Sequence, residues 1–175
     1  MNRILMIVAA CLSLLGGMAH AHGPSRLKTE QSVVLDASVE EVWAALGTFE
    51  DMSWLPGVTS IEATGNEKGA TRTRAMESGV TVSEELLKLD PAKYAISTRL
   101  TEDNLDYVLA TNYALHITLK DEGGKAKVDF KGAFYRGNPL NDPPPDQNDD
   151  ASKANVEALH QQMIDALVAK FGAAG

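Results

Sequence analysis

The sequence predicts an α+β domain in which a curved antiparallel sheet of about six to seven strands wraps around one long C-terminal helix. Short segments of strand-like residues, separated by turn residues, fill most of the chain from residue 27 to residue 135. Strands joined by such short turns pair antiparallel. The longest helical pattern follows them at 152–171, with its apolar residues on one stripe. Such a helix covers the apolar face of a curved sheet, and a cavity remains between the two where the sheet curls enough.

Composition limits the possible classes of function. The chain has 175 residues, 44% hydrophobic and 23% charged, which is typical of one globular domain. Its formal charge of -8 argues against a nucleic-acid binder, which needs a basic face, and against docking on anionic lipid. A disulfide scaffold is excluded because Cys11 is the single cysteine.

Residues 1–21 have the pattern of a secretory signal peptide. Arg3 precedes an apolar stretch, and Ala19-His20-Ala21 supplies small residues at the two positions that a signal peptidase reads. We therefore expect cleavage after Ala21 and an exported domain of residues 22–175. The apolar stretch is too short for a membrane anchor. Lipoprotein processing at Cys11 is the weaker alternative, because it leaves three leucines at the new terminus.

The first strand, at 27–35, leads into two predicted short helices. Ser38 and Glu41 have the spacing of a capping box, which predicts a helix that ends at Gly47. A shorter helical turn is expected at 50–54. The later strands are expected at 58–64, 71–76, 80–89, 94–100, 105–119 and 125–135, followed by an exposed Pro-rich loop at 137–150 and the helix at 152–171.

Candidate cavity residues follow from strand phase. In the 105–119 segment the odd positions are the apolar set, which places Tyr107, Thr111 and Tyr113 on the inner face. Their hydroxyl groups either meet a ligand or bond to backbone within the core, and the core role is the simpler interpretation. Phe130 and Phe134 share the inward phase of the next strand.

Three further residues complete the candidate cavity. Glu85 shares its phase with Leu87 and Leu89, which places it on the inner face. There it is a functional acid or the partner of Arg72, Arg74 or Arg99, unless the assigned phase of the strand is off by one residue. Trp54 either gates the cavity or packs as a lid residue. Met163 lies on the apolar stripe of the long helix.

No catalytic residue set is identified, and no cofactor is expected. The sequence has no G-x-S-x-G, P-loop, dinucleotide-binding or H-E-x-x-H motif. The phase of the strand sends His116 outward, and His160 lies beside the helix stripe as a rim or packing residue. After cleavage, His22 offers a terminal amine and an imidazole, which together chelate copper, but nothing else in the sequence supports a metal site.

The order of elements, with the residues that carry it, resembles the SRPBCC superfamily. The segment VVLDASVEEVWAALGTFEDMSWLPGVTSI at 33–61 is similar to the family's opening, and ELLKLDP at 85–91 is similar to its mid-sheet stretch. The resemblance implies the helix-grip fold of START lipid-transfer domains and polyketide cyclases. A signal peptide followed by His22-Gly23-Pro24-Ser25 resembles the MxaD-type accessory proteins of methanol oxidation, which are periplasmic.

Two functions follow as expectations. The MxaD-type resemblance implies a non-catalytic periplasmic accessory protein that helps methanol dehydrogenase pass electrons to its cytochrome c. The alternative is a carrier of a hydrophobic small molecule, or a cyclase- or dehydratase-like enzyme acting on one, with the ligand in the helix-grip cavity. No acid–base pair is identified for the enzymatic form of this alternative.

Overall fold

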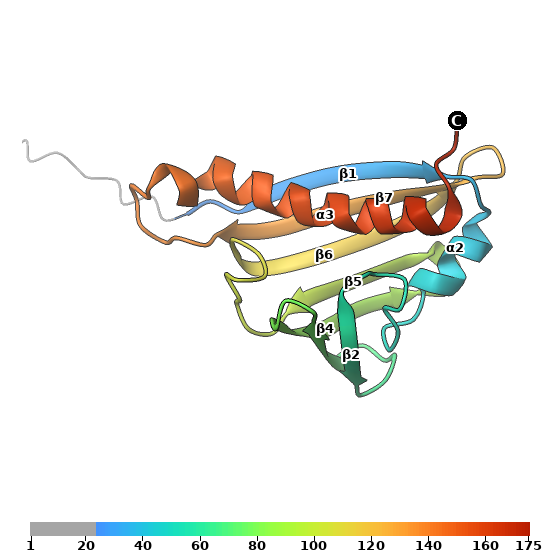
Figure 1. Ribbon diagram of the computed structural model, residues 1–175, viewed down its shortest axis with the longest axis horizontal. Helices are drawn as coiled ribbons and strands as arrows, with labels where there is room; N and C mark the ends of the chain where they lie inside the picture. The colour runs from blue at the N-terminus through green and yellow to red at the C-terminus, as the bar shows by residue number, and fades with distance from the viewer. Residues whose placement is uncertain (1–23) are drawn as a thin grey trace, which may run out of the picture.

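Seven antiparallel strands form one sheet, and the long helix α3 lies across it along β1 and β7 (Figure 1). The computed structural model describes residues 24–175. The order of strands in the sheet is β1-β7-β6-β5-β4-β3-β2, which confirms the predicted fold class. The strands are β1 (Leu27–Leu35), β2 (Val58–Ala63), β3 (Thr71–Met76), β4 (Thr81–Asp90), β5 (Ala95–Leu100), β6 (Ala110–Asp121) and β7 (Ala126–Arg136).

Two α-helices lie within residues 24–175, α2 (Val39–Leu46) and α3 (Asp149–Phe171). The predicted capping box of α2 is confirmed, with Ser38 and Glu41 bonded to each other's backbone N–H groups. The N-cap of α3 is Asn148, whose side chain accepts a hydrogen bond from the backbone N–H of Ala151 at 2.9 Å. The helix therefore starts three residues before the predicted start. Short 3-10 turns lie at η1 (Pro91–Lys93) and η2 (Pro145–Gln147).

The second helix expected at 50–54 is wrong. Asp51 accepts hydrogen bonds from both the backbone N–H and the hydroxyl of Ser53, at 2.7 and 3.0 Å, so this segment forms a side-chain-stabilised turn. Phe49 donates its backbone N–H to the side chain of Asn66 at 2.6 Å. These local bonds replace those of a helix and bring Trp54 against the core.

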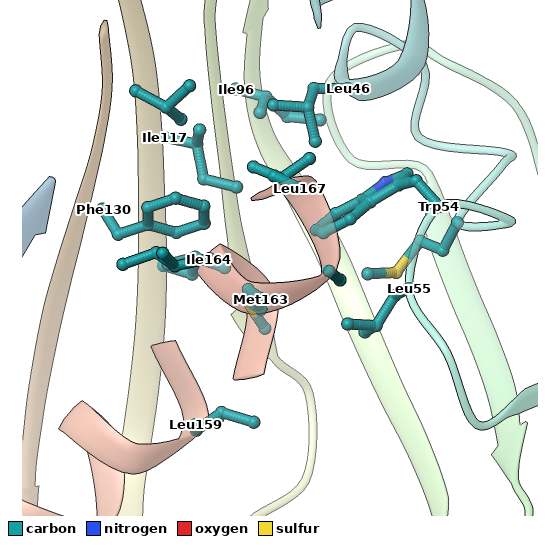
Figure 2. Close-up of a cluster of buried hydrophobic side chains, with 14 of the residues drawn as sticks. Leu46, Trp54, Leu55, Ile96, Ile117, Phe130, Leu159, Met163, Ile164 and Leu167 are labelled. Atoms are coloured by element: carbon teal, nitrogen blue, oxygen red, sulfur yellow. The ribbon is translucent and has the colours of Figure 1, made fainter. Parts of the chain in front are cut away.

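The core fills the space between the concave face of the sheet, α3 and the turn at 50–57. Figure 2 shows Met163 and Leu167 of α3 between Phe130 of β7 on one side and Trp54 on the other. All four side chains are buried. Packing along α3 thus joins the sheet to the turn.

Two sequence expectations lie outside the described residues. These are the signal peptide at 1–21, with its cleavage after Ala21, and the alternative copper site at His22. Between residues 24 and 175, no helix combines the length and the apolar character that crossing a membrane requires.

Candidate functional site

A groove of about 400 Å³ opens between the C-terminal half of α3 and the turn that leads into β2. Pockets that hold small organic ligands typically measure about 300–1,000 Å³, so this space is large enough for one. The lining is mostly apolar, with Leu55, Pro56, Met76, Leu159, Met163, Ala166 and Ala169, and its polar members are Tyr107, Gln162 and Asp165.

Three charged side chains are buried on the inner face of β3 and β4, next to this groove. Arg72 and Glu84 are directly paired residues of the two strands, and Arg74 lies two positions along β3 on the same face. The Oε2 atom of Glu84 accepts hydrogen bonds from Arg72 Nη2 at 2.7 Å and from Arg74 Nε at 3.2 Å. Arg74 is fully buried, and the other two are about 5% exposed. The cluster therefore carries two cations and one anion almost without water.

Mutual attraction keeps these groups ionised. Burial by itself raises the pKa of Glu84, but Arg74 and Arg72 lower it more strongly, so the net shift is downward. Burial lowers the pKa of Arg74, and Glu84 and Tyr107 reverse this effect and raise it above the ordinary value. The cluster thus has an excess of one positive charge at neutral pH.

Tyr107 and Met76 connect the charged cluster to the groove. Arg74 Nη2 donates to Tyr107 Oη at 2.7 Å, and Arg74 Nη1 lies 3.4 Å from the sulfur of Met76. Both residues line the groove. Tyr107 is held by its own turn, because its backbone N–H donates to the carbonyl of Asn104 at 3.1 Å.

A second space on the inner side of the sheet measures about 30 Å³, far too small for an organic ligand. Trp54, Arg72, Glu84 and Met163 are among the residues that line it. Met163 also lines the groove, so it separates the two spaces. Of these two spaces on the inner side of the sheet, the groove is therefore the candidate ligand site.

The structure brings three of the predicted site residues to these two spaces and places three others in the core. Tyr107 lines the groove, Trp54 the small cavity, and Met163 both. The core residues, Tyr113, Phe130 and Phe134, are buried and line neither space. The hydroxyl of Tyr113 lies 2.8 Å from Nε2 of His160, which is also fully buried rather than on the rim.

The expected inward phase of Glu85 is wrong by one residue. Glu85 is one-third exposed and pairs with Arg99 at 3.1 Å, whereas its neighbour Glu84 is buried. The register of β4 against β5 shifts between Leu86 and Lys88, so Leu87 is an extra residue in the strand. An extra residue reverses which positions of the strand face inward, so the alternation of the leucines does not predict the face on which Glu85 lies.

Thr111 also lies out of the expected phase. The register of β6 against β7 shifts between Thr111 and Ala114, and Asn112 within this irregularity has a φ of 50°. As a result, the buried residue that precedes Tyr113 on the inner face is Ala110 rather than Thr111. The hydroxyl of Thr111 bonds to the carbonyl of Arg136 at 3.4 Å.

Sequence reasoning did not identify the buried cluster. The signal was present, because Arg72 and Arg74 alternate with threonines in a strand and must share one face. The alternation in the sequence predicts Glu85 as the acid, with Arg72, Arg74 or Arg99 as its possible partner. Because of the bulge in β4, the buried acid that pairs with Arg72 and Arg74 is Glu84. Across residues 24–175, no three His, Cys, Asp or Glu side chains gather closely enough to hold a metal ion.

Comparisons with known proteins agree with this architecture. A search of the curated proteins found no match. XoxI from Bacillus cereus has a similar structure, with a TM-score of 0.68 and 22% identity over 82% of this chain and 94% of that one. A protein from Nitrosospira multiformis has a TM-score of 0.67 and 21% identity over 83% of this chain and 96% of that one. Truncated norcoclaurine synthase from Thalictrum flavum has a TM-score of 0.63 and 14% identity over 83% of this chain and 93% of that one.

At these identities the solved structures show a shared fold. The sequence itself carries the family assignment, because the model of the family described as polyketide cyclase / dehydrase and lipid transport matches residues 26–172. That range runs from the start of β1 to the end of α3 and includes every residue of the groove. The chain belongs to the polyketide cyclase / dehydrase and lipid transport family.

Proposed function

We propose that this protein binds and carries a small, largely apolar molecule in the groove between α3 and the Leu55–Pro56 turn. The observation that carries the proposal is the groove itself, about 400 Å³ with seven apolar lining residues out of ten. Burial of apolar ligand surface supplies affinity, and a few polar groups fix the orientation of the ligand.

The lining favours carriage over catalysis. Tyr107 and Asp165 are the titratable side chains among the described residues of the groove. Asp165 is exposed and accepts a hydrogen bond from Gln161 at 2.8 Å, which leaves it solvated on the rim. A cyclase or dehydratase needs a positioned acid and base, and these two groups offer no such pair.

A neutral fluorescent probe, N-phenyl-1-naphthylamine, tests the groove. We expect its fluorescence to rise when it binds the protein, and the variant Ala169→Trp to abolish the rise by filling the groove. Ala158→Trp is the matched control, because Ala158 is an exposed alanine of α3 outside the groove. Binding that survives in Ala169→Trp, or no binding to the unaltered protein, contradicts the proposal.

We also propose a periplasmic accessory role of the MxaD type, in which the protein promotes electron transfer from methanol dehydrogenase to cytochrome c. One surface feature favours it. The large hydrophobic side chains exposed within residues 24–175 are Leu105, 47% exposed, and Leu140, 60% exposed. Leu105 and Pro139, the residue before Leu140, line the same hollow of about 330 Å³.

Acidic residues surround these two leucines. Glu102, Asp103 and Asp106 flank Leu105, and Asp142 follows Leu140, all with exposed side chains. An apolar centre with an acidic rim complements a partner that has an apolar centre and a basic rim. We name this acidic, leucine-containing surface at 102–106 and 138–146 the acidic end.

The test follows electron transfer between purified methanol dehydrogenase and cytochrome c at low and moderate salt. Added protein is expected to raise the rate, and the triple variant Glu102→Gln, Asp106→Asn, Asp142→Asn to raise it less. A charge-matched control changes three exposed acids near the β2–β3 edge, Glu62→Gln, Glu67→Gln and Glu77→Gln. An unchanged rate at both salt concentrations, or equal loss in both triple variants, contradicts this role.

Export belongs to the same proposal and has its own measurement. N-terminal sequencing of the protein from the periplasmic fraction should begin at His22, the residue after the predicted cleavage position. Recovery of the protein only in the cytoplasm, with residues 1–21 still attached, contradicts export.

A further inference from the structure

The O–H of Tyr107 has no hydrogen-bond acceptor among the described residues. Arg74 Nη2 lies 2.7 Å from Tyr107 Oη, and a guanidinium group only donates hydrogen bonds, so the tyrosine oxygen is the acceptor. The O–H of Tyr107 therefore points to some other group, and no acceptor for it is found among residues 24–175. Because Tyr107 lines the groove, a ligand oxygen is a suitable acceptor.

Arg74 strengthens this O–H as a hydrogen-bond donor. The guanidinium carbon of Arg74 lies 4.9 Å from the centre of the Tyr107 ring, and the arginine is fully buried, so water does not screen its charge. Burial raises the pKa of Tyr107, which keeps its proton in place at neutral pH. A cation that bonds to the oxygen of a hydroxyl group also polarises the O–H bond of that group.

We propose that Tyr107, backed by Arg74, is the head-group anchor of the groove, and that the ligand is an apolar molecule ending in a carboxylate or another oxygen with negative charge. This inference rests on the proposed carrier function and adds the chemical class of the ligand. The buried cluster of Arg72, Arg74 and Glu84 supports it, because its excess positive charge attracts an anion and repels an amine.

Asp165 is the opposing charge on the groove. It lies on exposed α3 surface, where water and salt reduce its reach to about 8 Å at physiological ionic strength. Arg74 has no exposed surface, so its field acts through protein rather than through water. The cation therefore dominates at Tyr107.

Octanoate and 1-octanol, which share one chain length, test the anchor by isothermal titration calorimetry at pH 7.5. We expect Tyr107→Phe to lower the ratio of octanoate affinity to octanol affinity about ten-fold, because one charge-assisted hydrogen bond is lost. Tyr135→Phe removes the same atom from β7 at a residue outside the groove, and it should leave the ratio unchanged. Using the ratio cancels any general effect of the substitution on folding.

The outcomes separate the two proposals. If N-phenyl-1-naphthylamine binds in the groove but octanoate neither binds nor displaces it, the anchor is wrong and the carrier function stands. An unchanged ratio in Tyr107→Phe also overturns the anchor. If neither the dye nor either octyl compound binds, the carrier function itself fails.

Discussion

Glu84 and Glu85 are neighbours in the chain but lie on opposite faces of β4. Glu84 is buried between Arg72 and Arg74, whereas Glu85 is one-third exposed and pairs with the half-exposed Arg99. We predict that Glu84→Gln lowers the free energy of unfolding by about 3–5 kcal/mol, because it leaves two buried cations without their counter-ion. The matched change Glu85→Gln should cost about 1 kcal/mol or less. Urea denaturation followed by circular dichroism measures both, and equal losses contradict the assignment of the inner face.

The buried imidazole of His160 should make the stability of the protein depend on pH. Burial lowers its pKa from 6.5 to about 4, so the folded protein holds the imidazole neutral while the unfolded chain protonates it below about pH 6.5. The unfolded state then binds more protons, and stability falls as the pH drops from 6.5 towards 4. Between pH 7 and pH 5 this residue should account for a loss of about 2 kcal/mol.

The variant His160→Gln isolates this contribution from that of the carboxylates. It has no imidazole to protonate, so its free energy of unfolding should fall less between pH 7 and pH 5 than that of the unaltered protein. Tyr113 bonds to Nε2 of His160 in the folded state, and Nδ1 has no partner among the described residues. Equal losses in the two proteins would show that the imidazole is not held neutral.

At the level of elements, how far prediction from sequence succeeds depends on whether a strand is regular. The strands β1 and β3 begin and end at the predicted residues. In both, inward and outward side chains alternate without interruption, so the pattern in the sequence holds along the whole strand. β6 was predicted from Leu105 but begins at Ala110, since Asn104 holds the preceding segment in a turn. The charged cluster was missed for the same kind of reason. A bulge is set by pairing with the next strand, which the sequence of one strand does not contain.

The contact between α3 and β7 depends on Gly132. A Cβ atom at this position would lie 2.5 Å from Thr29 Oγ1, 3.1 Å from Val156 Cγ1 and 3.2 Å from His160 Cε1, all of which pack in the interface. We predict that Gly132→Ala lowers the free energy of unfolding by about 1–3 kcal/mol through overpacking. Thr29→Ala should restore part of the loss in the double variant, because it removes the nearest atom. Additive losses in the double-mutant cycle contradict a direct clash.

On the scale of the whole molecule, the two candidate functions use different parts of α3. The groove takes its lining from Leu159 to Ala169, whereas Ser152 lines the hollow of the acidic end. With a rise of 1.5 Å per residue, these positions are separated by roughly 10–25 Å along the helix. Substitutions on α3 at one site should therefore leave the other intact. The turn that contains Leu105 and Tyr107 is shared, because Leu105 lines the hollow of the acidic end and Tyr107 lines the groove.

The C-terminal residues cover the end of β1, which is one of the two edge strands of the sheet. Asp36 donates its backbone N–H to the carbonyl of Gly172 at 3.1 Å, and Ala174 donates to the carbonyl of Val34 at 3.0 Å, so the end of the chain pairs with the last residues of β1. We predict that deletion of residues 172–175 lowers the free energy of unfolding by about 1–3 kcal/mol, because these bonds are lost. The newly exposed backbone groups at the end of β1 should also increase self-association relative to the full chain. Urea denaturation and sedimentation velocity measure the two effects, and deletion of Gly175 alone is the control. A truncated protein with unchanged stability and sedimentation would mean that the terminal residues do not protect the edge.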